Sequence, residues 1–131
     1  MKRREWLAGA GAALAMTSLR IPAHSRGESP MYGLIGRMKA VAGQRDALIA
    51  LMLEEVGAMP GCLSYVVARD PTDADGIWIT EVWDSAASHK ASLSLPAVQQ
   101  VIARARPLIA GFAEHFETEP AGGHGLARSP T

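Results

Sequence analysis

Residues 77–96 read IWITEVWDSAASHKASLSLP, and the architecture of the whole chain can be inferred outward from them. As far as Trp83, β-branched and aromatic side chains alternate between two faces, which is the period of a β-strand. Asp84 and Ser85 then favour the N-cap of a helix, and residues 86–93 continue as that helix. The stretch therefore predicts a strand that runs directly into a helix, and we expect any chemical site to lie at this junction.

The chain on both sides of this stretch carries further strand and helix patterns. We expect strands at residues 31–40, 62–69 and 111–119, helices at residues 44–56 and 96–106, and a turn-rich loop at residues 70–76. The complete order is strand, helix, strand, strand, helix, strand, where the second helical region has two segments. This order is typical of an α+β, ferredoxin-like βαββαβ fold with an antiparallel sheet, and the domain should span residues 31–119.

The predicted sheet has two faces with different surroundings. Both helical regions cover one face, whereas the other face carries apolar side chains and stays bare. In the last strand, alternation places Phe112, Glu114 and Phe116 on one face and His115 on the opposite one. Because a bare apolar face of this size is unfavourable in water, we expect two copies to pack face to face as a homodimer.

Composition restricts the chain to a single domain and excludes several kinds of partner. The chain contains one cysteine, Cys62, so neither an intrachain disulfide nor a cysteine cluster for a metal can form. The loop at residues 70–76 lacks the acid pattern of a calcium loop, because Pro71 and Val82 stand at two ligand positions. Residues 26–131 contain nine basic and twelve acidic residues, a net charge of −3, and no motif or basic patch for nucleic acid. We therefore expect neither a bound metal nor a nucleic-acid partner.

Residues 1–25 have the organisation of an export signal rather than of a folded element. Lys2, Arg3 and Arg4 form its charged region, and the apolar stretch LAGAGAALAMTSL follows at residues 7–19. That stretch is shorter than the ~20 residues of a membrane span, so we expect no stable span. The paired arginines favour twin-arginine export to the periplasm, and an ordinary Sec signal is the alternative.

Residues 120–131 form a Gly-rich tail. His124 stands between glycines in the sequence GGHGL, and glycine lets the backbone turn sharply. The tail can therefore fold over a pocket and bring His124 to a ligand. The simpler interpretation is a tail without any such role.

Three motifs point to a known family: Pro60-Gly61-Cys62 leading to Tyr65, then Glu81-Val82-Trp83-Asp84-Ser85, then Leu93 with Pro96. By these motifs the chain resembles the antibiotic biosynthesis monooxygenase (ABM) domain family, and in particular its quinol monooxygenases, over residues 31–119. The resemblance implies a dimeric α+β barrel with a pocket between sheet and helices. It also implies, for many members, oxidation of phenols or quinols by O2 without metal or flavin cofactors. Other members degrade haem or act on small sugars and signalling molecules.

The chain departs from this family in the helix that follows the third strand. Many relatives carry a histidine nine residues after the Trp of the Glu-Val-Trp motif, where this chain has Ser92. His89 lies one helical turn earlier and faces roughly the same direction, and its role is inferred from this geometry rather than from a matched position. In the haem-degrading branch, an Asn, a Trp and a His occupy the positions of Gly36, Ser92 and Ile102. We therefore expect no haem degradation.

Oxygenation without a cofactor requires few groups from the protein. A base removes a proton from the phenol or quinol, an apolar cavity holds substrate beside O2, and the electron-rich anion reduces O2 itself. We predict that His89 is this base. The candidate substrate-binding residues, as aromatic walls or hydrogen-bond donors, are Tyr65, Trp78, Trp83, Ser92 and His124. Because Trp78 and Trp83 alternate along one strand, at most one of them faces a given cavity.

Other interpretations of the same residues remain open. His89 has polar neighbours and can be an exposed helix residue, and each tryptophan can simply belong to the core. The pocket can also bind or isomerise a small carbonyl compound without oxidising it, and such turnover would not need O2. A third hypothesis is a dimeric structural or stress-related module, which predicts a pocket filled by side chains.

Overall fold

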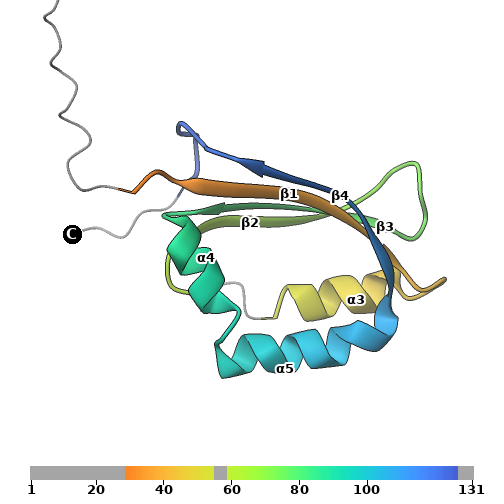
Figure 1. The fold of residues 1–131 in the computed structure, drawn as a ribbon. Coiled ribbons are helices and arrows are strands. Elements are labelled where there is room, and N and C mark those ends of the chain that lie inside the picture. The colour runs from red at the N-terminus through yellow and green to blue at the C-terminus, as the bar shows by residue number, and fades with distance from the viewer. Residues whose placement is uncertain (1–28, 55–58, 127–131) are drawn as a thin grey trace, which may run out of the picture.

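Residues 29–54 and 59–126, which the computed structural model describes, form one four-stranded antiparallel sheet with helices on one of its faces (Figure 1). The strands are β1 (Tyr32–Ala40), β2 (Cys62–Arg69), β3 (Gly76–Trp83) and β4 (Ile109–Thr118), in the spatial order β2-β3-β1-β4. The helices are α3 (Arg45–Met52), α4 (Ala86–Ser92), α5 (Pro96–Ala105) and the short 3-10 helix η3 (Arg106–Leu108). This arrangement confirms the predicted α+β, ferredoxin-like fold.

Some predicted segments lie wholly or partly outside the described residues. The expected export segment, residues 1–25, is outside them, and the Gly-rich tail is described as far as Leu126. The first helix was predicted to reach residue 56, but α3 ends at Met52, and Leu53 and Glu54 form a turn. None of the described helices has the length and the apolar composition needed to cross a membrane.

The junction between β3 and α4 is built as its sequence predicts. Ser85 is the N-cap of α4, and its Oγ accepts a hydrogen bond of 3.1 Å from the backbone N–H of Ser88. Gly61, just before β2, has a φ of 86°, and a Cβ there would lie 2.6 Å from Ser88 and 2.8 Å from Asp84. Only glycine permits this close approach, which brings the start of β2 against α4.

The core lies between the sheet and helices α3 and α5, on what we call the helical face of the sheet. The buried side chains of β3 on this face are Ile77, Ile79 and Trp83. Ile77 and Ile79 pack with Leu48 and Ile49 of α3 in one cluster. Burial of each such side chain contributes about 1.5–3 kcal/mol. The alternation predicted for this strand is therefore confirmed.

β4 departs from its predicted pattern, because a β-bulge changes which of its side chains share a face. His115 pairs with Gly36 of β1, whereas Phe112 pairs with Met38, so the register shifts by one residue between them. Paired residues of antiparallel strands point to the same face, which puts Phe112 and His115 on the helical face. Phe116 points to the opposite, outer face. The prediction that Phe112 and Phe116 share a face opposite His115 was therefore wrong, since strict alternation holds only in a regular ladder.

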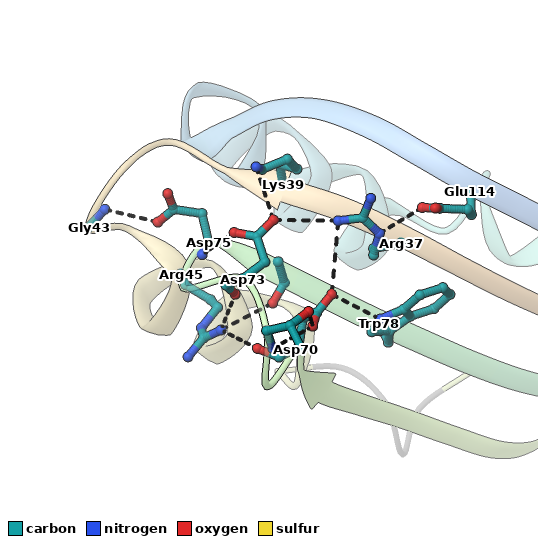
Figure 2. A network of polar contacts seen from close by, with 11 residues as sticks. Arg37, Lys39, Gly43, Arg45, Asp70, Asp73, Asp75, Trp78 and Glu114 are labelled. Carbon is teal, nitrogen blue, oxygen red and sulfur yellow. Dashed lines mark hydrogen bonds and ion pairs between the residues drawn. The ribbon is translucent and has the colours of Figure 1, made fainter.

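Charged side chains tie the loop between β2 and β3 to the rest of the domain (Figure 2). Arg45 of α3 donates hydrogen bonds to the backbone carbonyls of Asp70, Asp73 and Gly76, at 3.3, 2.9 and 3.3 Å. Within the loop, Asp70 accepts hydrogen bonds of 2.9 Å from both the N–H and the hydroxyl of Thr72. Defined contacts therefore hold this loop, which was expected only to be solvated.

Candidate functional site

A cavity of about 580 Å³ lies between the helical face of the sheet and helices α3 and α5. Its lining is mostly apolar and includes Met38, Leu48, Met52, Val98, Ile102 and Phe112. This volume and these walls suit a small organic molecule. A purely structural module would instead be expected to fill this space with side chains.

Polar side chains from β2, β3 and α4 meet at one end of the cavity. Glu81 of β3 is the cross-strand neighbour of Tyr65 of β2. Oε1 of Glu81 lies 4.0 Å from Nε2 of His89, and it accepts a hydrogen bond of 2.8 Å from the indole N–H of Trp83. An imidazole, a carboxylate and a phenol therefore form a polar end of a mostly apolar cavity.

Two aromatic rings hold the imidazole of His89. The ring centroid of Tyr32 lies 5.4 Å away, and that of Trp83 lies 5.3 Å away in an edge-to-face arrangement. The Tyr32 hydroxyl is itself anchored, because it donates a hydrogen bond of 2.7 Å to Glu117. The hydroxyl of Ser92 donates to the backbone carbonyl of His89 at 2.6 Å. The two aromatic rings position the imidazole, the Ser92 contact involves only the backbone of α4, and the His89 side chain remains 21% exposed.

The negative charge of Glu81 affects the acidic groups around it. Burial, and then the charge of Glu81, raise the pKa of Tyr65 well above its ordinary value of 10. The same two causes raise the pKa of the Cys62 thiol. Because the Tyr65 phenol stays protonated at neutral pH, it can donate a hydrogen bond to a ligand but cannot act as a base.

Four of the predicted site residues line this cavity: Tyr65, Trp83, His89 and Ser92. Trp83 is 1% exposed, so its ring is a wall of the cavity, and its N–H is already donated to Glu81. Ser92 is 4% exposed and has already donated its hydroxyl hydrogen to the carbonyl of His89. In the structure the Ser92 hydroxyl is therefore engaged with the backbone of its own helix, and its role toward a substrate stays a prediction.

Trp78 and His124 lie away from this cavity. Trp78 is on the outer face, where its indole N–H donates to Asp70 at 3.3 Å and the guanidinium of Arg37 lies 5.9 Å from its ring centroid (Figure 2). The two-residue period of β3 turns Trp78 away from Trp83. His124 is an exposed residue of the segment after β4, and it does not line the cavity. Neither residue therefore lines this cavity.

Sequence analysis missed Glu81 as a site residue, although its position carries a usable signal. Alternation along β3 puts this carboxylate on the helical face among three buried apolar residues, where an acidic residue is uncommon. Tyr32, which contacts His89, and Arg106 of η3, which lines the cavity, were also missed. Nothing in the local sequence distinguishes these two from ordinary strand and helix residues.

The described residues give no indication of a metal centre. Within residues 29–54 and 59–126, no three His, Cys, Asp or Glu side chains are grouped so that they could hold an ion. What the polar end of the cavity offers is a fixed imidazole, a carboxylate and a neutral phenol. This set suits the binding and deprotonation of a hydroxyl group on an apolar ligand.

Known proteins with the same fold include a close relative. A protein of Chloroflexus aurantiacus J-10-fl, assigned to the antibiotic biosynthesis monooxygenases, has a solved structure that is 69% identical in sequence. The match covers 74% of this chain and 99% of that one, with a TM-score of 0.72. A search of curated proteins finds no match.

More distant solved structures share the fold. A protein of Caulobacter crescentus CB15 with the same assignment is 19% identical over 76% of this chain and 99% of its own, with a TM-score of 0.62. SnoaB of Streptomyces nogalater, a cofactor-independent oxygenase, is 13% identical over 73% of this chain and 98% of its own, with a TM-score of 0.59. The family profile described as antibiotic biosynthesis monooxygenase matches residues 31–104. With the Chloroflexus relative, this match shows that the chain belongs to the antibiotic biosynthesis monooxygenase (ABM) domain family.

Proposed function

We propose that the protein is a cofactor-independent monooxygenase that oxidises a quinol or another phenolic small molecule with O2. The observation that carries this proposal is the position of His89, which stands beside Glu81 and Tyr65 at the polar end of an apolar cavity. Membership of the ABM family supports the same reaction class. The fold shared with SnoaB, itself a cofactor-independent oxygenase, is consistent with it.

The proposed reaction begins with the loss of a proton from a substrate hydroxyl. The O–H bond breaks, an N–H bond forms on the imidazole of His89, and the electron pair stays on the substrate oxygen. The hydroxyl of Tyr65 donates a hydrogen bond toward the negative charge that develops there. The electron-rich ring then reduces O2: a ring C–O bond forms, and the O–O bond and one ring C–H bond break. The second oxygen atom leaves as water with the proton held by His89 and the proton lost from the ring, and the substrate, which supplies all the electrons, leaves as a quinone. The apolar walls keep bulk water away from the reactive anion.

We propose that two copies pack through the outer faces of their sheets as a homodimer. On this face Val66 is 53% exposed and Phe116 is 54% exposed, and the described helices all lie on the other face (Figure 1). Burial of such side chains against a second copy removes apolar surface from water. The family resemblance implies the same dimeric α+β barrel.

We also propose that residues 1–25 direct export to the periplasm by the twin-arginine route. The paired Arg3 and Arg4 ahead of the apolar stretch at residues 7–19 support this assignment. Cell fractionation of a variant with both arginines replaced by lysine tests the route. Retention in the cytoplasm would support it, and unchanged periplasmic protein would instead favour a Sec signal.

Oxygen consumption tests the proposed reaction. The purified protein is mixed with a panel of naphthoquinols and catechols in the presence of a metal chelator, and each rate is corrected for autoxidation. Chelator-insensitive O2 uptake above the background rate is the expected result. Uptake at the background rate across the panel would contradict the proposal. Turnover that continues without O2 would instead favour isomerisation of a small carbonyl compound in the same cavity.

A further inference from the structure

Glu81 is a largely buried carboxylate that lacks a basic partner in the described part of the chain. Its side chain is 16% exposed, and Oε1 accepts one hydrogen bond, from the indole N–H of Trp83. Among residues 29–54 and 59–126, no lysine or arginine nitrogen lies within 4.0 Å of the carboxylate, and the one histidine nitrogen at that distance is Nε2 of His89. Burial of a carboxylate without a cation lowers the stability of a fold. A residue that lowers the stability of the fold in this way is typical of a functional site, so we expect the Glu81 carboxylate to contact a ligand.

The geometry of Glu81 and His89 leaves room for one oxygen atom between them. Oε1 and Nε2 are 4.0 Å apart, and an oxygen at about 2.8 Å from each fits between two atoms at that separation. A ligand hydroxyl in this position can donate its hydrogen to the carboxylate and accept one from a protonated Nε2. It can equally donate to an unprotonated Nε2. The indole N–H of Trp83 keeps Oε1 in place for this contact.

We infer that Glu81 is a specificity-determining residue: it binds a neutral aromatic hydroxyl between its Oε1 and Nε2 of His89, and it rejects ligands with an anionic group at that position. The aromatic class of the ligand rests on the proposed function. The selection for a neutral hydroxyl rests on the carboxylate itself and requires no O2. In the proposed reaction, Glu81 fixes the substrate oxygen beside the base before the proton moves to Nε2.

The charges around the cavity support this selectivity. At the polar end, Tyr65 is a neutral phenol, because burial and the charge of Glu81 raise its pKa. Among the described side chains at this end, only His89 can carry a positive charge that balances the carboxylate. Arg106 lines the cavity from η3, beyond the end of α5 that is remote from α4 (Figure 1), and it is exposed to solvent. A ligand anion beside Glu81 would meet a like charge at short range. Arg106 can attract an anionic group only at the other end.

Anaerobic binding calorimetry at pH 7 tests this inference with three probes that share one ring system. The probe 1-naphthol has a neutral hydroxyl, 1-methoxynaphthalene lacks the donor hydrogen, and 1-naphthoate is an anion. The variant Glu81→Gln removes the charge but keeps an oxygen that can accept the N–H of Trp83. Glu54→Gln is the matched control, because Glu54 is a surface carboxylate that pairs with Arg104 at 2.8 Å, outside the cavity.

The wild-type protein is expected to bind 1-naphthol at least about 10-fold more tightly than 1-methoxynaphthalene, since hydrogen bonds to charged acceptors are strong. It should bind 1-naphthoate most weakly of the three. Glu81→Gln is expected to lose part of the preference for 1-naphthol, because an amide oxygen accepts a weaker hydrogen bond than a carboxylate does, and to bind 1-naphthoate more tightly than the wild type does. Glu54→Gln should keep the wild-type order. The Tm of Glu81→Gln checks that the variant is folded, which is expected because Gln keeps the acceptor oxygen for the N–H of Trp83.

Equal affinities of the wild type for 1-naphthol and 1-methoxynaphthalene would overturn the inference. Unchanged preferences in a folded Glu81→Gln variant would do the same. These results are separable from those for the proposed reaction, because binding is measured without O2. Oxygen uptake together with unchanged preferences would overturn only the role of Glu81, and clear preferences without oxygen uptake would overturn only the oxygenation.

Discussion

Trp78 and Trp83 lie on the same strand but on opposite faces of the sheet, and each donates its indole N–H to a carboxylate. On the outer face, Trp78 donates to Asp70, whose carboxylate also lies 3.9 Å from the guanidinium of Arg37 (Figure 2). On the helical face, Trp83 donates to Glu81, and among the described residues no lysine or arginine joins that pair. A tryptophan that donates to a carboxylate is therefore part of an ion-pair network on the outer face, whereas on the helical face the same kind of pair lines the cavity.

The two faces differ in what their carboxylates do. The outer-face acids are stabilised by donors from the protein: the pKa of Glu114 is lowered, chiefly by a hydrogen bond of 2.6 Å from Arg37. The charge of Glu81 instead affects a neighbouring group: it is the second cause, after burial of the phenol, of the raised pKa of Tyr65. A carboxylate with hydrogen-bond and ion-pair partners in the protein contributes to the stability of the fold. A carboxylate with few such partners can instead accept hydrogen bonds from a ligand. Four predictions test how far the two faces differ.

The largest expected effect is on activity. His89→Ala should lower kcat/KM for O2-dependent oxidation by about 100-fold or more, because it removes the proposed general base. His115→Ala is the matched control, since His115 lies on the same face of the sheet but outside the cavity, and it should leave kcat/KM unchanged. Steady-state oxygen uptake measures both variants. Full activity of His89→Ala would remove the imidazole from the reaction.

The next effect is on stability, and it compares the two faces within β3. Ile77→Ala should lower the free energy of unfolding by about 2–5 kcal/mol, because Ile77 is fully buried on the helical face. Thr80→Ala, on the outer face that the proposed homodimer covers, should cost less than Ile77→Ala, because it shortens a smaller side chain that is exposed in the single copy. Urea denaturation gives both values. Similar losses for the two variants would mean that the outer face is packed as tightly as the core.

The third effect is on assembly. Phe116→Lys should convert the proposed homodimer to a monomer, because it places a charge in the apolar part of the outer face. Val41→Lys is the control: Val41 is 40% exposed and lies just after β1, outside the sheet. Light scattering after size exclusion measures the mass of each. A wild-type protein that is already monomeric would contradict the proposed dimer.

The smallest effect concerns the acid sensitivity of the outer-face network. A carboxylate with a lowered folded-state pKa adds stability above its unfolded pKa, near 4, and that stability is lost as the pH falls through the folded value. Arg37→Gln removes the chief cause of the lowered pKa of Glu114. The variant should therefore lose less stability than the wild type between about pH 5 and pH 3. Urea midpoints across this range measure the difference, and parallel curves would mean that Arg37 has no part in it.

The fold was predictable because its local signals agree with one another. Alternation along β3, the N-cap at Ser85 and the proline at the start of α5 all appear in a short stretch and are all present in the structure. The bulge in β4 was not predictable, because it depends on register against β1 rather than on the pattern of β4. The contacts of Arg45 with the loop were missed for the same reason, since they join segments 25 to 31 residues apart.

The candidate site was predictable in its location and less so in its members. His89 and Trp83 were identified because they flank the predicted strand–helix junction, and both line the cavity. Trp78 was included on residue type alone, although its own alternation already turned it to the other face. The distance between Glu81 and His89 depends on how α4 folds back over β3, and residue spacing does not give it.

The most direct test of the central claim is to record which face of the sheet responds to a ligand. In an anaerobic titration of ¹⁵N-labelled protein with 1,4-naphthohydroquinone, the indole N–H signals of Trp83 and Trp78 report on the two faces separately. The account predicts that the Trp83 signal shifts in a saturable way while the Trp78 signal stays in place. A saturable shift of Trp78 alone, or no shift of Trp83 at any ligand concentration, would contradict the assignment of the cavity as the active site.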